Sequence, residues 1–142
     1  MLRVHGLGQV RETLSLAVVA ERGPELADAL DICERLRLHI RDAGALASAL
    51  DRPAQVVLGN EAYVGIPVKG AALLDAINRS HPLLDGNERL SVLLVALLYR
   101  LDGFDLVIDP AEGDAFMREV AGDVHPEMDK IAAWLEDRAV AH

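Results

Sequence analysis

The amino-acid sequence predicts an all-α fold, a mainly helical bundle around a central buried helix with one small β-hairpin. Apolar residues recur every three or four positions through most of the chain, which is the period of amphipathic helices. Residues 87–102 are apolar nearly all round, as expected of a helix that other helices enclose. Residues 55–64 give the one strand-like stretch with a clear turn signal.

The first third of the chain predicts three helices. Residues 9–22 form a helical pattern that stops at Gly23-Pro24, and residues 25–41 carry an apolar stripe with charges opposite. Cys33 lies on that stripe, so we expect a thiol in the core rather than a reactive one. After a stop at 42–44, residues 45–50 predict a short third helix.

The middle of the chain predicts the hairpin and the central helix. In residues 55–64 two short apolar runs flank Gly59-Asn60, a dipeptide typical of a turn. Residues 68–79 then show a helical pattern, and the central helix over 87–102 ends at Gly103.

The C-terminal part predicts one extended segment and two amphipathic helices. Residues 106–108 favour an extended conformation, and residues 110–120 and 127–141 show helical patterns. We interpret Phe116 and Trp134 as packing anchors rather than site residues.

The composition places the chain in a broad class. A length of 142 residues with 51% hydrophobic side chains fits a single domain spanning residues 1–142. One cysteine excludes an internal disulfide framework and a cysteine-based zinc cage. The longest apolar run, residues 92–99, is less than half of the ~20 residues that span a bilayer. No N-terminal segment has the pattern of a secretory signal. We therefore expect a cytoplasmic protein that makes no membrane contact.

The charge distribution narrows the choice of ligands. The net charge is −9, which disfavours direct binding to nucleic acid or anionic lipid. Residues 1–100 hold 12 acidic and 11 basic side chains, whereas residues 101–142 hold 11 and 3. The first hundred residues are therefore nearly neutral and can still provide a local site for a small anion such as a nucleotide.

The residues most suited to chemistry lie in the segment 79–89, directly before and within the start of the central helix. The first N–H groups of a helix are unpaired and bind anions well, and Gly86 lets a phosphate approach the backbone. Arg89 can donate to phosphate oxygens, and Asp85 can hold Mg²⁺ shared with them. His81 is the side chain here that can accept a proton near neutral pH.

A purely structural interpretation of the same residues is also open. Asp85-Gly86-Asn87 has the sequence of an ordinary turn followed by a helix start, and His81-Pro82 that of a helix stop. Composition and spacing alone do not decide between the two interpretations.

Residues 81–89, His-Pro-Leu-Leu-Asp-Gly-Asn-Glu-Arg, resemble the signature of the Fic/Doc family, His-Pro-Phe-x-(Asp/Glu)-Gly-Asn-x-Arg. Residues 41–53 resemble the Arg-Asp-Pro-Gly-Leu-Leu-x-Ser-Ala-Leu-x-Arg-Pro block of its death-on-curing (Doc) toxins. Tyr63 with residues 69–74 resembles their Tyr…Lys-Ala-Ala-Ala-Leu-Leu stretch, and residues 102–104 match their Asn-Gly-aromatic helix stop. The resemblance covers roughly residues 41–120, so residues 1–40 are expected to be a helical N-terminal extension.

The resemblance implies an enzyme that binds ATP and Mg²⁺ and modifies a protein hydroxyl. It gives His81 the role of the base, and it assigns metal and phosphate contacts to the signature loop, with Asp85 at the metal. Arg79 matches a phosphate-facing arginine of the Doc toxins. Arg52 and Lys69 add positive charge in the same nearly neutral part of the chain. The expected nucleotide-binding residues are therefore Arg52, Lys69, Arg79, Asp85, Gly86, Asn87 and Arg89.

The resemblance also implies a reaction, a target and a partner. AMP-transferring Fic enzymes have a second arginine three residues after the first, whereas this chain has Val92 there. That residue matches the Doc branch, whose members transfer the γ-phosphate to a threonine of elongation factor Tu. The hairpin over 55–64 matches the flap that aligns the target chain, by strand addition. The implied partner is a small Phd-type antitoxin whose C-terminal segment folds into a groove near this flap.

Two residues depart from the family pattern. Leu83 replaces a phenylalanine, and another large apolar side chain can fill that place. Glu88 replaces the lysine of the Doc toxins, and a like-charge pair at ~4 Å in an effective dielectric near 20 is unfavourable by ~4 kcal/mol. One alternative to a Doc-like toxin is an AMP-transferring Fic enzyme, which Val92 disfavours. The other, suggested by Glu88, is a catalytically attenuated Fic/Doc-like module.

Overall fold

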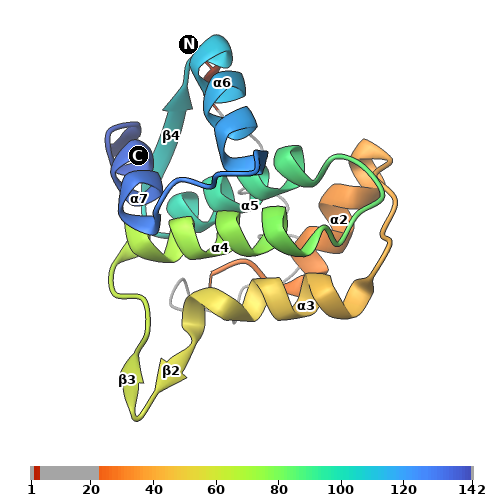
Figure 1. Ribbon diagram of the computed structural model, residues 1–142, viewed down its shortest axis with the longest axis horizontal. Coiled ribbons are helices and arrows are strands. Elements are labelled where there is room, and N and C mark those ends of the chain that lie inside the picture. Colours follow the sequence, from red (N-terminus) through yellow and green to blue (C-terminus); the bar gives the residue numbers. More distant parts are fainter. Residues whose placement is uncertain (1, 4–22, 142) are drawn as a thin grey trace.

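The computed structural model describes residues 2–3 and 23–141 and is mainly helical, as the sequence predicts (Figure 1). The predicted helix over residues 9–22 lies outside the described residues. The described helices are α2 (Leu26–Leu36), α3 (Ala43–Asp51), the 3₁₀ turn η2 (Arg52–Ala54), α4 (Ile66–Ser80), α5 (Asn87–Leu101), α6 (Pro110–Ala121) and α7 (Met128–Glu136). The strands are β1 (Leu2–Arg3), β2 (Val56–Val57), β3 (Asn60–Glu61), β4 (Phe104–Ile108) and β5 (Ala139–Ala141).

Two helices share the centre of the molecule. The predicted central helix is confirmed as α5, in which Leu90, Leu94 and Leu97 are fully buried. It packs along α4, which runs through the middle of Figure 1 with α3 on one side and α6 and α7 on the other. Because α4 and α5 are consecutive, the loop that joins them starts and ends on two helices of the core.

Gly70 lets α4 approach its neighbours closely. A Cβ atom at this position would lie 3.2 Å from Leu135 Cδ1, and 3.3 Å from Tyr99 Cε2 and Val95 Cγ1. Those atoms belong to side chains of α5 and α7, so a larger side chain would press on two neighbouring helices at once.

We expect Gly70→Val to lower the free energy of unfolding by about 1 to 3 kcal/mol, because overpacking a close helix contact forces backbone shifts. Gly44→Val is the matched control, since Gly44 lies in helix α3 and its Cβ would meet only Asp42 Oδ1, at 3.4 Å. Urea denaturation of both variants measures the difference. Equal stability of the two variants would contradict the assignment of Gly70 as a close-contact position.

A small sheet replaces part of the predicted C-terminal helix. The extended segment over 106–108 is confirmed within β4, which pairs antiparallel with β1 on one side and β5 on the other. The helix predicted over 127–141 is wrong beyond Glu136, because residues Ala139–Ala141 form β5. The edge of β4 explains the change: the Val107 N–H donates to the Arg138 carbonyl at 2.8 Å, so the chain gains strand hydrogen bonds by leaving the helix.

The helix predicted over 25–41 ends early, at Leu36. Arg37 adopts a left-handed conformation with a φ of 56°, and the Leu38 N–H donates to the Cys33 carbonyl. The chain then runs extended, and Ile40 forms an isolated β-bridge with Leu83. The end of the predicted helix is thus used to hold the loop between α4 and α5.

The hairpin is confirmed, with its turn one residue earlier than predicted. Val57 pairs with Asn60 in the β2–β3 register, so Leu58 and Gly59 form the turn with φ angles of 52° and 82°. The hairpin projects away from the helices in Figure 1, and Leu58 at its tip is 96% exposed.

The aromatic and sulfur side chains behave as predicted. Phe116 of α6 stacks on Trp134 of α7 with ring centroids 4.2 Å apart, which joins the two C-terminal helices. Cys33 is 3% exposed, and burial raises the pKa of its thiol. In the described part of the chain, no helix is long and apolar enough to cross a membrane.

The buried position of Cys33 predicts slow alkylation. A raised pKa leaves less thiolate at pH 8, and the thiolate is the reactive form. We expect iodoacetamide to label the native protein at least roughly tenfold more slowly than the urea-unfolded protein at that pH. Labelling at equal rates would show that Cys33 is not part of the folded core.

Candidate active site

The loop between α4 and α5 begins and ends on residues with left-handed backbone. His81 is the C-cap of α4, with a φ of 48° and its N–H donated to the Ile77 carbonyl. Gly86 is the N-cap of α5, with a φ of 86°. A Cβ at Gly86 would lie 2.8 Å from Leu38 Cδ2, so both the conformation and the space favour glycine.

Asn87 holds the loop closed from the first turn of α5. Its Oδ1 accepts the Leu83 N–H at 2.8 Å, and its Nδ2 donates to the Leu83 carbonyl at 3.1 Å. The side chain therefore pairs with the backbone of Leu83 as a neighbouring strand would. Leu83 itself is 1% exposed and fills the core position that the sequence analysis expected it to fill.

The segment before α3 holds the loop from the other side. The Pro82 carbonyl accepts the N–H groups of Arg41 and Asp42, at 2.8 and 3.0 Å. Arg41 Nε also donates to the His81 carbonyl at 2.8 Å, and a second nitrogen of that guanidinium donates to the Ser80 carbonyl at 2.9 Å. The backbone that carries His81 is therefore fixed by Arg41, whose role the sequence indicates only through the family resemblance of residues 41–53.

One cavity brings most of the predicted site residues together. It has a volume of about 440 Å³, within the usual range for small-ligand sites. Five of the predicted residues line it: His81, Asp85, Gly86, Asn87 and Arg89. The other lining residues are Asn78, Leu84, Glu88 and Ala121. We call this space the motif cavity.

The motif cavity has the parts of an anion site. The N-cap residue of α5 is Gly86, which has no side chain to accept a hydrogen bond from the first N–H groups of the helix. These N–H groups can therefore donate to a bound anion. Arg89, in the first turn of the helix, is exposed and lines the cavity. Glu88, which is half-buried, also lines the cavity and brings a negative charge to the same helix end.

Asp85 fits a magnesium ion only if other ligands complete the site. Its Oδ1 accepts the Gly86 N–H at 2.9 Å, and the side chain is exposed. Among the described residues, no group of three or more His, Cys, Asp and Glu side chains could hold a metal by itself. Protein-bound Mg²⁺ often uses one or two carboxylates plus substrate phosphates and water, so Asp85 fits a metal shared with a nucleotide.

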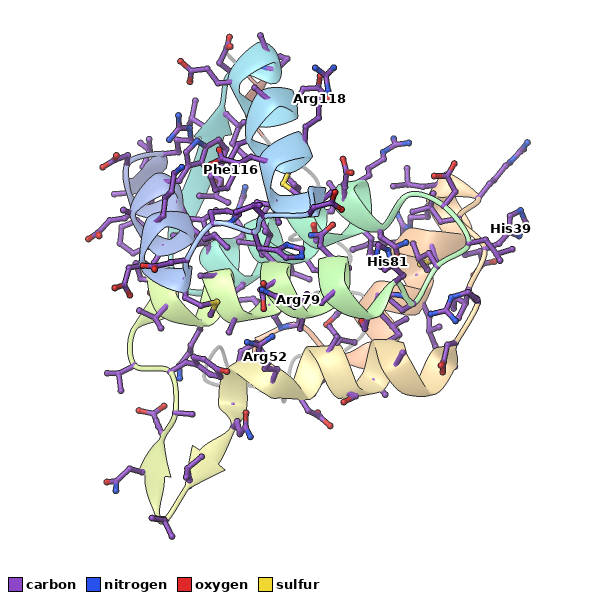
Figure 2. The ribbon with its side chains drawn as sticks, in the orientation of Figure 1. His39, Arg52, Arg79, His81, Phe116 and Arg118 are labelled. Atoms are coloured by element: carbon purple, nitrogen blue, oxygen red, sulfur yellow. The ribbon has the colours of Figure 1, made fainter. Side chains whose placement is uncertain are left out.

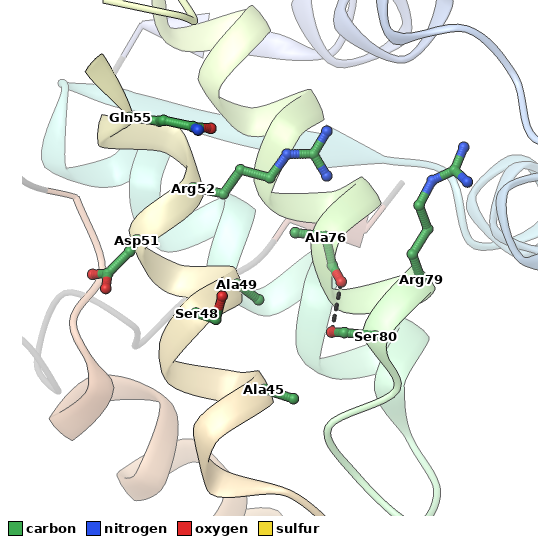
Figure 3. A pocket seen from close by; sticks show the side chains of 9 residues that line it. All are labelled: Ala45, Ser48, Ala49, Asp51, Arg52, Gln55, Ala76, Arg79 and Ser80. Atoms are coloured by element: carbon green, nitrogen blue, oxygen red, sulfur yellow. Dashed lines mark hydrogen bonds between the residues drawn. The ribbon is translucent and has the colours of Figure 1, made fainter. Parts of the chain in front are cut away.

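Arg52 and Arg79 lie in a second, larger space of about 770 Å³ between α3 and α4 (Figure 3). Figure 2 shows these two side chains near each other, with His81 further along at the end of α4. Small residues line much of this space: Ala45, Ser48, Ala49, Ala76 and Ser80. We call it the α3–α4 groove. The structure therefore separates the predicted residues Arg52 and Arg79 from the motif cavity.

Lys69 lies at the base of the hairpin. Its Nζ forms an ion pair with Glu61 at 2.9 Å and donates to the carbonyls of Tyr63 and Pro53. These bonds join β3 to α4. A phosphate contact by Lys69 stays a prediction, and its present partners are protein groups.

Asp75 is the site residue that sequence reasoning missed. Its carboxylate is 6% exposed and accepts from both Arg52 and Arg79. Burial alone lowers the pKa of the Arg52 guanidinium, but hydrogen bonds from Arg52 to Tyr63 and Asp75 outweigh it, so this pKa is raised. An acid within the apolar run 71–77, four residues before an arginine, was the available signal.

The fold and the site define a helical protein with a polar loop between the core helices α4 and α5, and His81 is the first residue of this loop. The model of the Fic/DOC family matches residues 18–99. The chain is also 36% identical over 106 residues to Toxin Doc of Mycolicibacterium smegmatis, covering 73% of this chain and 81% of that protein. This chain belongs to the Fic/DOC family. No solved structure matches the chain significantly. The family match begins and ends earlier than the region 41–120 on which the sequence resemblance rests.

Proposed function

We propose that this chain is a Doc-like toxin that transfers the γ-phosphate of ATP to a hydroxyl of a target protein. The observation that carries the proposal is the motif cavity, where His81, Asp85 and Arg89 meet at the start of α5. Membership of the Fic/DOC family and the similarity to Toxin Doc support the same class of activity.

In the proposed reaction the hydroxyl oxygen forms a bond to the γ-phosphorus while the bond between that phosphorus and the ADP oxygen breaks. His81 accepts the hydroxyl proton, and its backbone is fixed by Arg41 for that task. The first N–H groups of α5 and Arg89 stabilise the charge on the phosphate oxygens. Mg²⁺ held by Asp85 would neutralise further phosphate charge.

The hairpin suits the alignment of a target chain. It consists of two short strands that pair with each other, and its apolar residues Val57 and Leu58 are exposed. An extended target segment can add to such an edge through backbone hydrogen bonds. A threonine of elongation factor Tu is the target that the family resemblance implies.

The proposed partner is a small Phd-type antitoxin bound in the α3–α4 groove. The name Toxin Doc of the similar protein supports a toxin–antitoxin module. The alanines that line the groove leave room for a helix of the partner, and the groove reaches the hairpin through Gln55. On this proposal, co-expression of the cognate antitoxin relieves the growth arrest that the toxin causes.

Glu88 favours a second candidate, a catalytically attenuated Fic/Doc-like module. Its carboxylate lines the motif cavity at the helix end where phosphates would bind. Such a module would keep the fold and the groove but would bind nucleotide weakly.

The test is to incubate the purified protein with γ-labelled or α-labelled ATP, Mg²⁺ and a cell extract. Transfer of the γ-label supports the proposed function, and transfer of the α-label would show AMP transfer instead. If the parent protein transfers no label and Glu88→Lys does, the attenuated module is supported. If neither protein transfers label, both enzymatic interpretations fail.

A further inference from the structure

The two carboxylate oxygens of Asp75 accept hydrogen bonds from two arginines that lie in different elements. Its Oδ1 accepts from Arg79 Nε at 2.8 Å, within α4, and its Oδ2 accepts from the Nη1 atom of Arg52 at 2.9 Å, from η2. The carboxylate is almost completely buried, whereas the Arg79 side chain is 54% exposed. The hidden acid therefore holds an arginine whose outer part remains accessible.

A continuous series of contacts runs through Asp75 from the hairpin to the motif loop. Tyr63, just after β3, accepts Arg52 Nε at 3.0 Å through its hydroxyl. Arg52 bonds to Asp75, and Asp75 bonds to Arg79, which stands two residues before His81. Figure 3 shows the Arg52 side chain reaching across to α4 beside Arg79.

We propose that Asp75 is a positioning residue that fixes the Arg79 guanidinium for a phosphate and links it to the hairpin. The phosphate part rests on the proposed function, and it requires the phosphates of ATP to extend from the motif cavity to the α3–α4 groove that Arg79 lines. A guanidinium has five N–H donors, and Asp75 engages only the Nε–H of Arg79, so the terminal donors can face an anion. Because Asp75 already holds Nε, the Arg79 side chain loses less conformational entropy when it binds a ligand than a free, exposed arginine would.

The carboxylate also separates two positive charges. Arg52 and Arg79 both approach α4, and without the negative charge of Asp75 they would repel each other. Replacement of Asp75 by asparagine keeps the size but removes the charge. We expect the Arg79 guanidinium to move outward and the Arg52–Tyr63 contact at the hairpin base to loosen.

Asp105 provides a matched control. Its side chain is also 6% exposed and pairs with Arg100 at 2.9 Å, and Arg100 is 27% exposed, close to the 29% of Arg52. Asp105 lies in β4, after the end of α5 opposite to the motif loop. Asp105→Asn should therefore reproduce the loss of a buried ion pair without touching the site.

The first measurement needs no nucleotide. In ¹H–¹⁵N NMR spectra of the parent protein, we expect slowly exchanging Nε–H signals from Arg52 and Arg79 and a protected Ala62 amide, which donates to the Gln55 carbonyl within the hairpin. Asp75→Asn should abolish the Arg79 signal and speed Ala62 exchange at least roughly fivefold, whereas Asp105→Asn should do neither. Unchanged Ala62 exchange in Asp75→Asn would overturn the link to the hairpin.

The second measurement is a double-mutant cycle on the affinity for ATP with Mg²⁺. We expect Asp75→Asn to weaken binding about tenfold in the parent and less than about twofold in the Arg79→Ala background. Equal weakening in both backgrounds would show that Asp75 does not act through Arg79, and the positioning role would fall.

The two measurements separate failure of this inference from failure of the proposed function. A parent protein that binds no ATP overturns the proposed function and the phosphate role of Arg79. The NMR result then still decides whether Asp75 links Arg79 to the hairpin.

Discussion

His81→Ala is expected to abolish transfer of the γ-phosphate, with a rate at least two orders of magnitude below that of the parent protein. A positioned general base contributes about 10² to 10⁴ to the rate, and His81 is the histidine that lines the motif cavity. Transfer of γ-label to the target measures the rate. Nucleotide affinity should change little, because the phosphate contacts proposed here come from α5 and the arginines.

Backbone conformation requires a second variant at this position. His81 has a φ of 48°, a conformation that asparagine adopts more readily than alanine. His81→Asn therefore removes the base while it preserves the shape of the loop, and it should lose transfer to the same extent.

His39 gives the matched control. It is an exposed histidine beside the same loop, and its contact with the loop is through the backbone carbonyl, which accepts the Leu84 N–H at 3.0 Å (Figure 2). His39→Ala keeps that bond, so transfer should stay within about twofold of the parent. Full activity of His81→Asn, or equal loss in His39→Ala, would contradict the role of His81.

The parts of the site that could be predicted are contiguous in the sequence. His81, Asp85 and Arg89 fall within nine residues, so a helix–loop–helix pattern is enough to bring them to one cavity. The hairpin and the central helix were equally visible, since each is a local pattern with a clear period. The early end of α2 was not visible, because it depends on Ile40 pairing with Leu83, far along the chain.

The α3–α4 groove shows why the rest could not be predicted. Asp75 and Arg52 are 23 residues apart, and their pairing depends on how α4 lies against η2. Helical periodicity gives the face of a residue but not the partner of a buried charge. The resemblance indicated Arg79 and the charge distribution indicated Arg52 as nucleotide-binding residues, but the carboxylate that they share became visible only in three dimensions.

Glu88→Lys is expected to increase the affinity for ATP with Mg²⁺ by about two orders of magnitude, since it removes one repulsive contact and adds one attractive contact. A pair of unit charges ~4 Å apart is worth ~1 kcal/mol in water and ~4 kcal/mol at an effective dielectric of 20. Glu88 is half-buried, so the two contacts together account for roughly 2.7 kcal/mol even near the lower limit. Titration calorimetry measures the change, and Glu88→Gln should give an intermediate affinity.

Asp129→Lys is the control that separates the effect of charge in the motif cavity from the effect of charge at a helix N-terminus. Asp129 is the second residue of α7, as Glu88 is the second residue of α5, and both are acids in a first helical turn. Both reversals remove a favourable interaction with a helix dipole and add an unfavourable one, so both should lower stability by about 0.6 to 2 kcal/mol. Only the change at Glu88 lies in the motif cavity, and only it should change nucleotide affinity. Equal affinity of the parent and Glu88→Lys would mean that this carboxylate does not oppose the phosphates, and the attenuated module would lose its physical basis.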